Sequence, residues 1–428
     1  MEKTNFFNEN FLFKVKNCVE NQNKWRGTQT INLIASENTP SELVQNLSYS
    51  DFAHRYAEGL VYQREYQGQK YHDEIEEISM KSIEKLFNCS YSDVRCPTAT
   101  IANIAIYYGL CKQGDPIFSL SVPDGAHISM RKFGGAGLRG LKIYDIPFDY
   151  EKYNIDLDLF GNLILGIKPK LITLGASVFL FPHPIKEIKK ICKDLNVIIH
   201  YDASHVLGLI AGGEFQDPLN EGADIVMGST HKTFPGPQGA VIYTNNEELI
   251  KKVQRAIFPG TVSNHHLHRL APLAICCCEM YHFGKEYAKQ IIKNAKFFAK
   301  ELDKRGFNVI GKRLGYTQSH QVLIDLSEFG KGLKNAQLLE RADIITNKNL
   351  IHGDITGKDT SDPSGLRIGV QEMTHFGMKE NEFKIIAEFF ERIIINNENP
   401  DKIKFEVNEL RANYIKVRYT FEEKIKRE

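Results

Sequence analysis

The sequence predicts an α/β protein whose main domain is built on a mostly parallel sheet. Short apolar runs at residues 171–175, 197–201, 225–227 and 240–243 are bounded by polar or glycine-rich turns, as buried strands are. Between the first two runs, residues 184–195 repeat apolar side chains at helical spacing. Because a strand, a helix and another strand in succession form a parallel pair, this order predicts a parallel sheet covered by helices.

The elements are expected to form an arm and two domains. Residues 1–30 are polar and aromatic and predict an N-terminal helical arm, and residues 31–284 predict the large domain. A long helix is expected to lead into a smaller C-terminal α/β domain over residues 285–428, with Gly306 ending the helix. The apolar side chains that recur at helical spacing there are Tyr287, Ile291, Ala295, Phe298 and Leu302.

Composition excludes several classes of protein. The net charge of +1 carries no signal for nucleic acid or an anionic membrane, and no apolar run is long enough to cross a bilayer. The N-terminus has no signal-peptide pattern. The eight cysteines form no CxxC pair and the histidines have no zinc spacing, so we expect reduced thiols, a cytoplasmic location and no metal.

Lys232 and Asp202 are the most informative residues, because each follows one of the expected strands. Asp202 ends the run at 197–201, and Lys232 comes shortly after the run at 225–227. In parallel sheets ligands bind beyond the carboxyl ends of the strands, where both side chains would lie. A lysine that forms a Schiff base and an aspartate that protonates a pyridine nitrogen predict pyridoxal 5'-phosphate (PLP). Taken alone, Lys232 would be interpreted as a surface lysine at the start of a loop.

Residues 97–103 begin a helix with small hydroxyl residues. Such a helix start, with its free backbone N–H groups, is typical of a phosphate site, although an ordinary N-cap is the alternative. No GxxxxGK[ST] motif is present, which argues against a P-loop nucleotide site.

Further polar residues are candidates for the same site. His127 is expected either to stack on the PLP ring or to be a structural histidine. Arg367 lies in an apolar run at 363–369, where it needs an anion: the carboxylate of an amino acid, or an internal Asp or Glu. Polar islands at 34–38 and 55–59 offer a carboxylate for acid–base chemistry, or only helix caps and surface charge.

Together these segments resemble serine hydroxymethyltransferase, a family of fold-type I PLP enzymes, over residues 31–390. The archaeal-type branch is the most similar, on the motifs at residues 121–125, 205–212, 228–234 and 262–268. The resemblance implies a PLP-dependent transferase that converts serine reversibly to glycine. The one-carbon unit would pass to a reduced pterin, either tetrahydrofolate or tetrahydromethanopterin.

The resemblance also implies roles for individual residues. Lys232, Glu58, His127 and Tyr66 would be catalytic, with Glu58 as the acid or base at the hydroxymethyl group. Substrate would be bound by Ser36, Tyr66, His205 and Arg367. The residues expected to hold the cofactor are Thr98, Ala99 and Thr100 at the phosphate, Ser177 and His205 beside the phenolic oxygen, and His127, Asp202, Ser229, Lys232, Tyr56, Ser263 and Asn264.

Some of these positions belong, in the family, to the neighbouring subunit. They are Tyr56, Glu58, Tyr66, Ser263 and Asn264, so the resemblance implies a homodimer with shared active sites, or a tetramer. Three residues depart from patterns common in the family: Glu65 replaces a tyrosine near the pterin, Ala99 replaces a glycine, and Gln238 replaces an arginine.

Two alternatives keep the same fold. The changed residues after Glu58 are also compatible with a pterin-independent threonine-type aldolase or transaldolase that joins glycine to another aldehyde. The second alternative is a catalytically silent protein of the PLP fold that serves as a binding partner.

Overall fold

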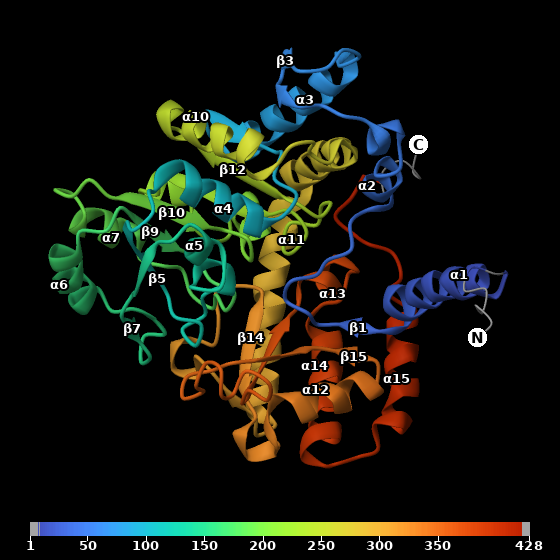
Figure 1. Ribbon diagram of the computed structural model, residues 1–428. Helices are drawn as coiled ribbons and strands as arrows, with labels where there is room; N and C mark the ends of the chain where they lie inside the picture. The colour runs from blue at the N-terminus through green and yellow to red at the C-terminus, as the bar shows by residue number, and fades with distance from the viewer. Residues whose placement is uncertain (1–6, 8, 422–428) are drawn as a thin grey trace, which may run out of the picture.

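The computed structural model describes residue 7 and residues 9–421. A continuous helix, α11 (Leu270–Lys304), runs from the large domain into the small one (Figure 1). The apolar side chains expected to recur along it are all buried, and Gly306, with φ +93°, follows its end. The boundary expected near residue 285 therefore falls inside one unbroken helix.

The large domain is built on a seven-stranded sheet in the order β4-β12-β11-β10-β9-β5-β6. Strands β5, β6, β9, β10 and β11 are parallel, whereas β12 and β4 are antiparallel to their neighbours. Residues 230–239 join β11 to β12, and this connection is too short for a parallel crossover. The strands are β4 (Tyr91–Asp93), β5 (Pro116–Ser119), β6 (Lys142–Asp145), β9 (Leu171–Leu174), β10 (Ile198–Asp202), β11 (Ile225–Ser229) and β12 (Ala240–Thr244). The mostly parallel α/β fold is confirmed.

Both faces of this sheet are buried. Ile225 and Met227 of β11 pack in a cluster with α4 (Ala99–Leu110) and α10 (Glu247–Arg255), while Val226 between them packs in the main core on the other face. Neighbouring residues of a strand point to opposite faces, so strands covered on both sides are apolar throughout. This is why the strands appear in the sequence as continuous apolar runs.

The small domain holds a four-stranded antiparallel sheet in the order β13-β14-β17-β16. Its strands are β13 (Asn308–Val309), β14 (Gln321–Asp325), β16 (Asn347–Asn349) and β17 (Gly365–Gly369), and its helices include α12 (Lys331–Arg341), α14 (Glu380–Phe390) and α15 (Pro400–Ala412). Near the N-terminus, β1 (Ile31–Asn32) pairs with β15 (Ile344–Ile345) of the small domain. The chain therefore enters the large domain only after β1.

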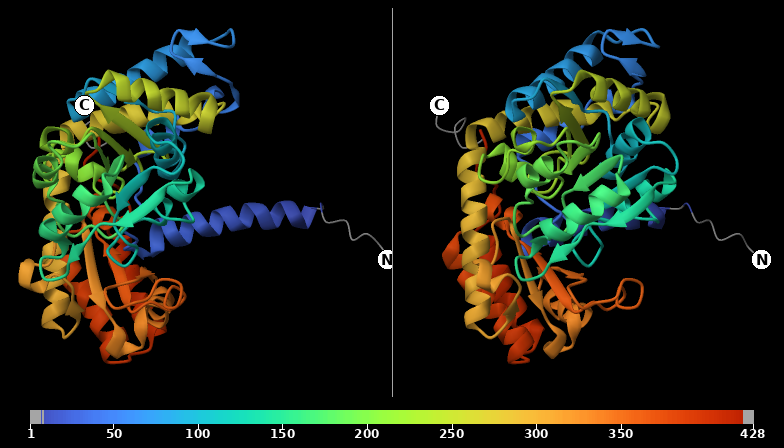
Figure 2. Two further views of the ribbon diagram at one scale, coloured as in Figure 1. Left: turned by 60° about the vertical axis from the view of Figure 1, so that its left-hand side comes forward. Right: turned by 90° about the vertical axis from the view of Figure 1, so that its left-hand side faces the viewer.

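The expected N-terminal helix is present as α1 (Glu9–Lys24), and it projects from the body of the molecule (Figure 2). Its exposed apolar side chains include Leu12 and Phe13. Immediately after it, the Trp25 indole N–H donates to Asp343 Oδ1 at 2.8 Å and anchors the base of the arm on the small domain.

The remaining elements complete the two layers around the sheets. The helices are α2 (Glu42–Leu47), α3 (Lys70–Phe87), α5 (Gly135–Leu138), α6 (Leu157–Ile167), α7 (Ile185–Ile191), α8 (Leu207–Ala211), α9 (Pro218–Glu221) and α13 (Gln371–His375). Two short hairpins are formed by β2 (Gly59–Leu60) with β3 (Gln63–Arg64), and by β7 (Phe148–Asp149) with β8 (Asn154–Ile155). Among the described residues no helix is long and apolar enough to span a membrane.

Truncating a side chain where α11 meets the small domain tests this packing. Phe298 is fully buried and its ring lies 5.5 Å from that of Phe383 and 5.7 Å from that of Phe390, between centroids. We expect Phe298→Ala to lower the free energy of unfolding by about 3–5 kcal/mol, because apolar contact is lost and a cavity remains. Denaturant titration measures this, with the exposed Phe405→Ala as the control. Equal, small shifts in both variants would contradict the packing.

Candidate active site

The carboxyl ends of β9, β10 and β11 meet at one edge of the central sheet. Asp202 is the last residue of β10, Ser229 is the last of β11, and Lys232 lies three residues further on. A cavity of about 320 Å³ opens beyond these ends. The residues expected at the site that line it are Ser36, Thr98, Ala99, Thr100, His127, Ser177, Asp202, His205, Ser229 and Lys232.

Lys232 faces this cavity and is not an ordinary surface lysine. Burial lowers the pKa of its amine to about 8; the Asp202 carboxylate opposes this shift and the Arg367 guanidinium adds to it. Its backbone is fixed, because Asn38 Nδ2 donates to the Lys232 carbonyl at 2.6 Å. The next residue, Thr233, donates from its hydroxyl to His205 O at 2.9 Å and accepts from Gly208 N at 3.0 Å. The backbones at Gly208 and Thr233 lie so close together that a side chain on Gly208 would clash, because its Cβ would lie 2.2 Å from Thr233 O.

Asp202 is held by two donors from its own chain. Asn103 Nδ2 donates to Asp202 Oδ2 at 3.0 Å, and Ser204 N donates to Asp202 Oδ1 at 2.9 Å. Asn103 Nδ2 also lies 3.5 Å from Ser129 Oγ, which is 2.7 Å from His127 Nδ1. A short polar chain thus connects the aspartate to His127, whose pKa is lowered by burial and by the nearby charge of Lys232.

The start of α4 forms the opposite end of the cavity. Thr98 is the N-cap of this helix, and its Oγ1 accepts from Ile101 N at 3.2 Å. Thr98 therefore caps the helix and also lines the cavity, so the N-cap interpretation is confirmed and the phosphate site stays a prediction. The backbone N–H groups of the first helical turn point towards the N-terminus of the helix, where an anion is favoured by the helix dipole.

Arg367 lies beside the cavity on β17 and has no carboxylate partner among the described residues. Its Nη1 donates to Ser177 O at 2.9 Å, and Nε and Nη2 lie 3.4 and 3.3 Å from Asn347 Oδ1. Burial lowers the pKa of Arg367 to about 10. Because a buried guanidinium is costly without an anion, this arrangement favours a bound carboxylate over the internal salt bridge.

His205 is placed by residues that sequence reasoning did not single out. Gln321 Nε2 lies 3.0 Å from His205 Nδ1 and donates to Ser177 O at 2.8 Å, so one amide holds two lining residues. The ring of His320 stacks on that of His205, with 5.6 Å between centroids. Burial lowers the pKa of His205 well below its ordinary value. The imidazole is therefore neutral at physiological pH.

Six expected site residues do not line the cavity: Arg367, which lies beside it, and Tyr56, Glu58, Tyr66, Ser263 and Asn264, which lie elsewhere. The latter five form a cluster of their own: Ser263 Oγ donates to Glu58 Oε1, Ala57 N donates to Asn264 Oδ1 at 3.0 Å, and the rings of Tyr56 and Tyr66 lie 5.6 Å apart. Both tyrosines are exposed. A single chain therefore does not assemble the whole expected site.

Sequence reasoning also missed residues that support the lining. Asn103 is a lone amide in an otherwise apolar helix, and that polarity is the signal that marks it. His231 lines the cavity and its buried Nδ1 has no hydrogen-bond partner among the described residues. Burial, with the charges of Lys232 and Arg269, lowers its pKa to about 4. A neutral imidazole next to the reactive lysine adds no positive charge to the site.

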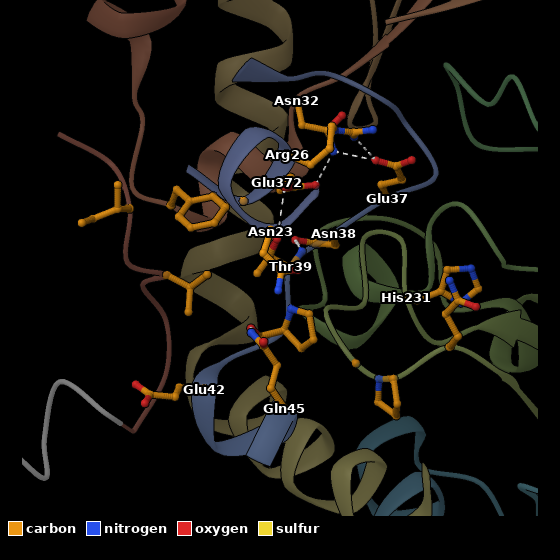
Figure 3. Close-up of a pocket in the computed structure, with 18 of the residues that line it drawn as sticks. Asn23, Arg26, Asn32, Glu37, Asn38, Thr39, Glu42, Gln45, His231 and Glu372 are labelled. Carbon is orange, nitrogen blue, oxygen red and sulfur yellow. Dashed lines mark hydrogen bonds and ion pairs between the residues drawn. The ribbon is translucent and has the colours of Figure 1, made fainter. Parts of the chain in front are cut away.

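A larger cavity of about 810 Å³ adjoins the first and shares Ser36, His231 and Gln238 with it (Figure 3). On one wall, Asn32 Nδ2 donates to Glu372 Oε2 at 2.5 Å and to Glu37 Oε2 at 2.9 Å. Burial raises the pKa of Glu372 to about 7, and the charge of Glu37 contributes. These contacts fix the segment 32–39, which carries Ser36 to the smaller cavity and Asn38 to the Lys232 carbonyl.

The residues of the smaller cavity fit PLP. A lysine amine of lowered pKa, without a hydrogen-bond partner among the residues that the structure describes, lines the cavity together with an aspartate, and the N-terminus of α4 can bind a phosphate there. On a mostly parallel sheet with a small second domain, these features define a PLP-dependent enzyme of fold-type I. In agreement, the solved structure of an L-threonine transaldolase from Pseudomonas fluorescens superimposes with a TM-score of 0.88 at 28% identity, over 97% of this chain and 94% of that one.

Sequence comparisons identify the family. The family model described as serine hydroxymethyltransferase matches residues 12–390. Serine hydroxymethyltransferase from Pyrococcus horikoshii is 51% identical, over 96% of each chain, and the protein of that name from Methanothermobacter marburgensis is 47% identical, over 97% of each. The chain belongs to the serine hydroxymethyltransferase family. It is a PLP-dependent transferase that interconverts serine and glycine, as the sequence predicted.

The lowered pKa of Lys232 has a measurable consequence. Only the neutral amine is nucleophilic, so in cofactor-free protein the labelling of Lys232 by an amine-directed reagent should rise with pH around a midpoint of about 8 and level off about one pH unit higher. An amine with the ordinary pKa of 10.5 would still be gaining reactivity at pH 9.5. Peptide mapping of the labelled lysine from pH 6 to 10.5 gives the midpoint. A midpoint near 10.5 would contradict the desolvated site.

Proposed function

We propose that the cavity at the strand ends is where this chain interconverts serine and glycine, with PLP attached at Lys232. The observation that carries the proposal is the lysine amine, which has a lowered pKa and faces Asp202 across a cavity closed at one end by α4. Thr98, Ala99, Thr100 and Ser229 would hold the phosphate, and His127 would lie against the ring. When bound, PLP supplies an electron sink for negative charge at the substrate α-carbon.

The chain's own groups act on protons and on the amino acid. Asp202, fixed by Asn103 and Ser204, would keep a proton on the pyridine nitrogen. Arg367 and Ser36 would bind the substrate carboxylate, because Arg367 has two-point geometry and no acidic partner among the described residues. Ser177 and His205 would flank the phenolic oxygen. Glu58 would exchange a proton with the substrate hydroxyl as the acid or base.

Glu58 reaches that position only from another subunit in this proposal. The partly exposed cluster of Tyr56, Glu58, Tyr66, Ser263 and Asn264 lies apart from its own cavity, and it would complete the site of a second copy. The exposed apolar residues of α1 also offer surface for such contact. The assembly is a homodimer with shared active sites, or a tetramer of two such dimers. The eight free cysteines fit the reduced thiols of the cytoplasm.

The reduced pterin would bind next to the amino acid. A cavity of about 180 Å³ shares Ser177 with the catalytic cavity, and Gly125, Val178 and Leu350 supply a partly apolar wall. Lys348 lies on the same wall and would pair with an anionic tail, either the glutamate of tetrahydrofolate or the acidic tail of tetrahydromethanopterin. Glu65, beside Tyr66 on the exposed hairpin, would approach this region from the other subunit.

The reaction is tested by serine cleavage with the wild-type holoenzyme and Lys232→Ala. We expect wild-type cleavage to depend on tetrahydrofolate or tetrahydromethanopterin, and Lys232→Ala to lose at least about a hundredfold in rate, because the amine that binds PLP is gone. PLP should also fail to remain on the denatured variant after borohydride treatment. The exposed Lys193→Ala is the control. Rapid cleavage without any pterin, or joining of glycine to another aldehyde, would favour the transaldolase.

Arg367→Lys tests the carboxylate site. Lysine keeps the charge but loses the planar fork, so we expect the glycine dissociation constant to rise about tenfold to a hundredfold, from the loss of a charge-assisted hydrogen bond of about 1.5–3 kcal/mol. PLP content should be unchanged. Arg341→Lys, at an exposed ion pair with Asp401, is the matched control. Unchanged glycine affinity with lower stability would make Arg367 a structural residue.

A further inference from the structure

The hairpin that follows Glu58 has little structure of its own to hold it. Strands β2 and β3 contain two residues each and pair only with one another. An isolated two-stranded hairpin is at best marginally stable in water. Its turn residue Tyr62 has φ +61°, and Leu60 and Tyr62 are exposed. The position of Glu58 must therefore be fixed by contacts that tie the hairpin to the rest of the large domain.

Arg64, the last residue of β3, joins the backbone around Glu58 to the helix α3. Its Nη1 donates to the carbonyls of Ala57 and Gly59, both at 3.1 Å, and these two residues flank Glu58 in the chain. Its other nitrogens donate to Asp73 Oδ1 at 2.8 Å and Glu76 Oε2 at 2.7 Å, on one face of α3. The Arg64 side chain is only 3% exposed. One guanidinium thus ties the backbone on both sides of Glu58 to a helix of the large domain.

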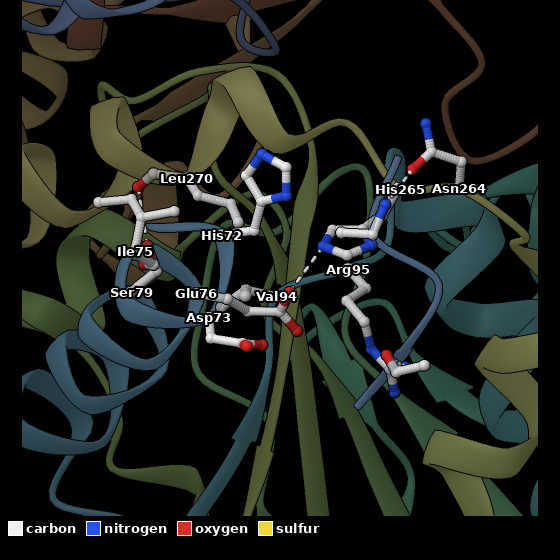
Figure 4. A network of polar contacts seen from close by, with 12 residues as sticks. His72, Asp73, Ile75, Glu76, Ser79, Val94, Arg95, Asn264, His265 and Leu270 are labelled. Carbon is white, nitrogen blue, oxygen red and sulfur yellow. Dashed lines mark hydrogen bonds and ion pairs between the residues drawn. The ribbon is translucent and has the colours of Figure 1, made fainter. Parts of the chain in front are cut away.

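The network then returns to the Glu58 side chain. Glu76 Oε2 also lies 2.7 Å from His265 Nε2, as the dashed line in Figure 4 shows. His265 is two residues from Ser263, whose hydroxyl donates to Glu58 Oε1, and Asn264 between them accepts from Ala57 N. The contacts form a closed ring from the backbone around Glu58 through Arg64, Glu76 and His265 to the Glu58 carboxylate.

The ring places opposite charges side by side in a buried region, where the guanidinium of Arg64 pairs with the carboxylates of Asp73 and Glu76. Side chains of Arg64, Glu76 and His265 are at most 3% exposed. Burial alone would raise the pKa of Glu76, but the hydrogen bond from His265 and the charges of His265, Arg64 and Arg95 outweigh it and lower the pKa. Removing the guanidinium would leave the carboxylates of Asp73 and Glu76 short of their partner in a buried place. The ring is therefore rigid, because a small shift of Arg64 breaks several contacts at once.

We propose that Arg64 is a positioning residue for the reaction: through the ring with Glu76 and His265 it sets where the Glu58 carboxylate is presented, and it does so for the active site of the neighbouring subunit. The proposal rests on the proposed function of Glu58 in a shared site. Arg64 itself touches neither substrate nor cofactor. It is expected to act in trans although every contact it makes lies within its own chain.

The first measurement compares holoenzymes with one substitution each. Lysine at position 64 keeps the charge but cannot bind two carbonyls and two carboxylates together. We expect Arg64→Lys to lower kcat for serine cleavage about a hundredfold, as displacement of a catalytic group by about 1 Å can do, with wild-type PLP content. Arg55→Lys is the matched control, because Arg55 pairs with Asp51 at the exposed surface of the same segment. A wild-type kcat in Arg64→Lys overturns the proposal.

The decisive measurement uses mixed dimers, purified with two different tags, of an Arg64→Lys chain and a Lys232→Ala chain. One site then combines an intact Lys232 with an intact hairpin, and the other combines both defects. If Arg64 acts in trans, each mixed dimer holds one complete site and shows about half the wild-type rate. A mixed dimer no faster than the Arg64→Lys homodimer overturns the proposal, because a defect confined to its own subunit is not rescued.

A parallel mixed dimer separates this proposal from the shared site itself. Glu58→Gln combined with Lys232→Ala should also recover about half the wild-type rate. Failure of that pair refutes the shared site, whereas its success together with failure of the Arg64→Lys pair refutes only the role of Arg64. If Arg64→Lys does not yield folded protein, Glu76→Gln keeps an acceptor for Arg64 and replaces it in both measurements, with the same two outcomes decisive.

Discussion

The parallel pairing of β9, β10 and β11 is the constraint on which the site depends. Tyr201 pairs with Leu174 and Asp202 pairs with Met227. The three strands therefore end close together at the same edge of the sheet. Residues that follow these strands are brought together although they are far apart in the sequence. The sheet buries both faces and excludes water below the site, and this desolvation gives Lys232 its lowered pKa. The parallel sheet therefore both brings the site residues together and, by burial, lowers the pKa of Lys232.

Three side-chain amides connect the segments that meet at this edge of the sheet. Asn103 connects Asp202 with Ser129, Gln321 connects Ser177 with His205, and Asn38 connects the Lys232 carbonyl with the Tyr287 hydroxyl. Each amide comes from a different part of the chain: α4, β14 of the small domain, and the segment after β1. Buried polar groups are costly unless paired, so these bridges specify one relative placement of the segments. Tyr287 lies on α11, which extends the same placement to the small domain.

The sequence was sufficient for the sheet, the long helix and most of the cavity, because each is encoded locally. Apolar runs mark strands buried on both faces, and Lys232 and Asp202 follow directly from where those runs end. Motif resemblance added Ser177 and Ser36, whose role no local pattern reveals. What could not be predicted depends on packing between distant segments. The start of α11 at Leu270 has no breaker before it, and Gln321 and His320 look like ordinary residues at a strand start. The antiparallel direction of β12, by contrast, follows from the short connection over residues 230–239 and is encoded locally.

The separation of the cavity from the Glu58 hairpin has an energetic consequence for assembly. In the proposed dimer each chain gives a finished hairpin to the other, because Arg64, Glu76 and His265 secure it before any second copy arrives. Ordering a loop at an interface would cost conformational entropy for each immobilised side chain, and a preformed element avoids most of that cost. An isologous two-fold contact then completes two sites at once, since each chain both offers and receives the same element. In the proposed dimer, the rigidity of the hairpin after Glu58 would therefore serve the active site of the neighbouring subunit more than the stability of its own chain.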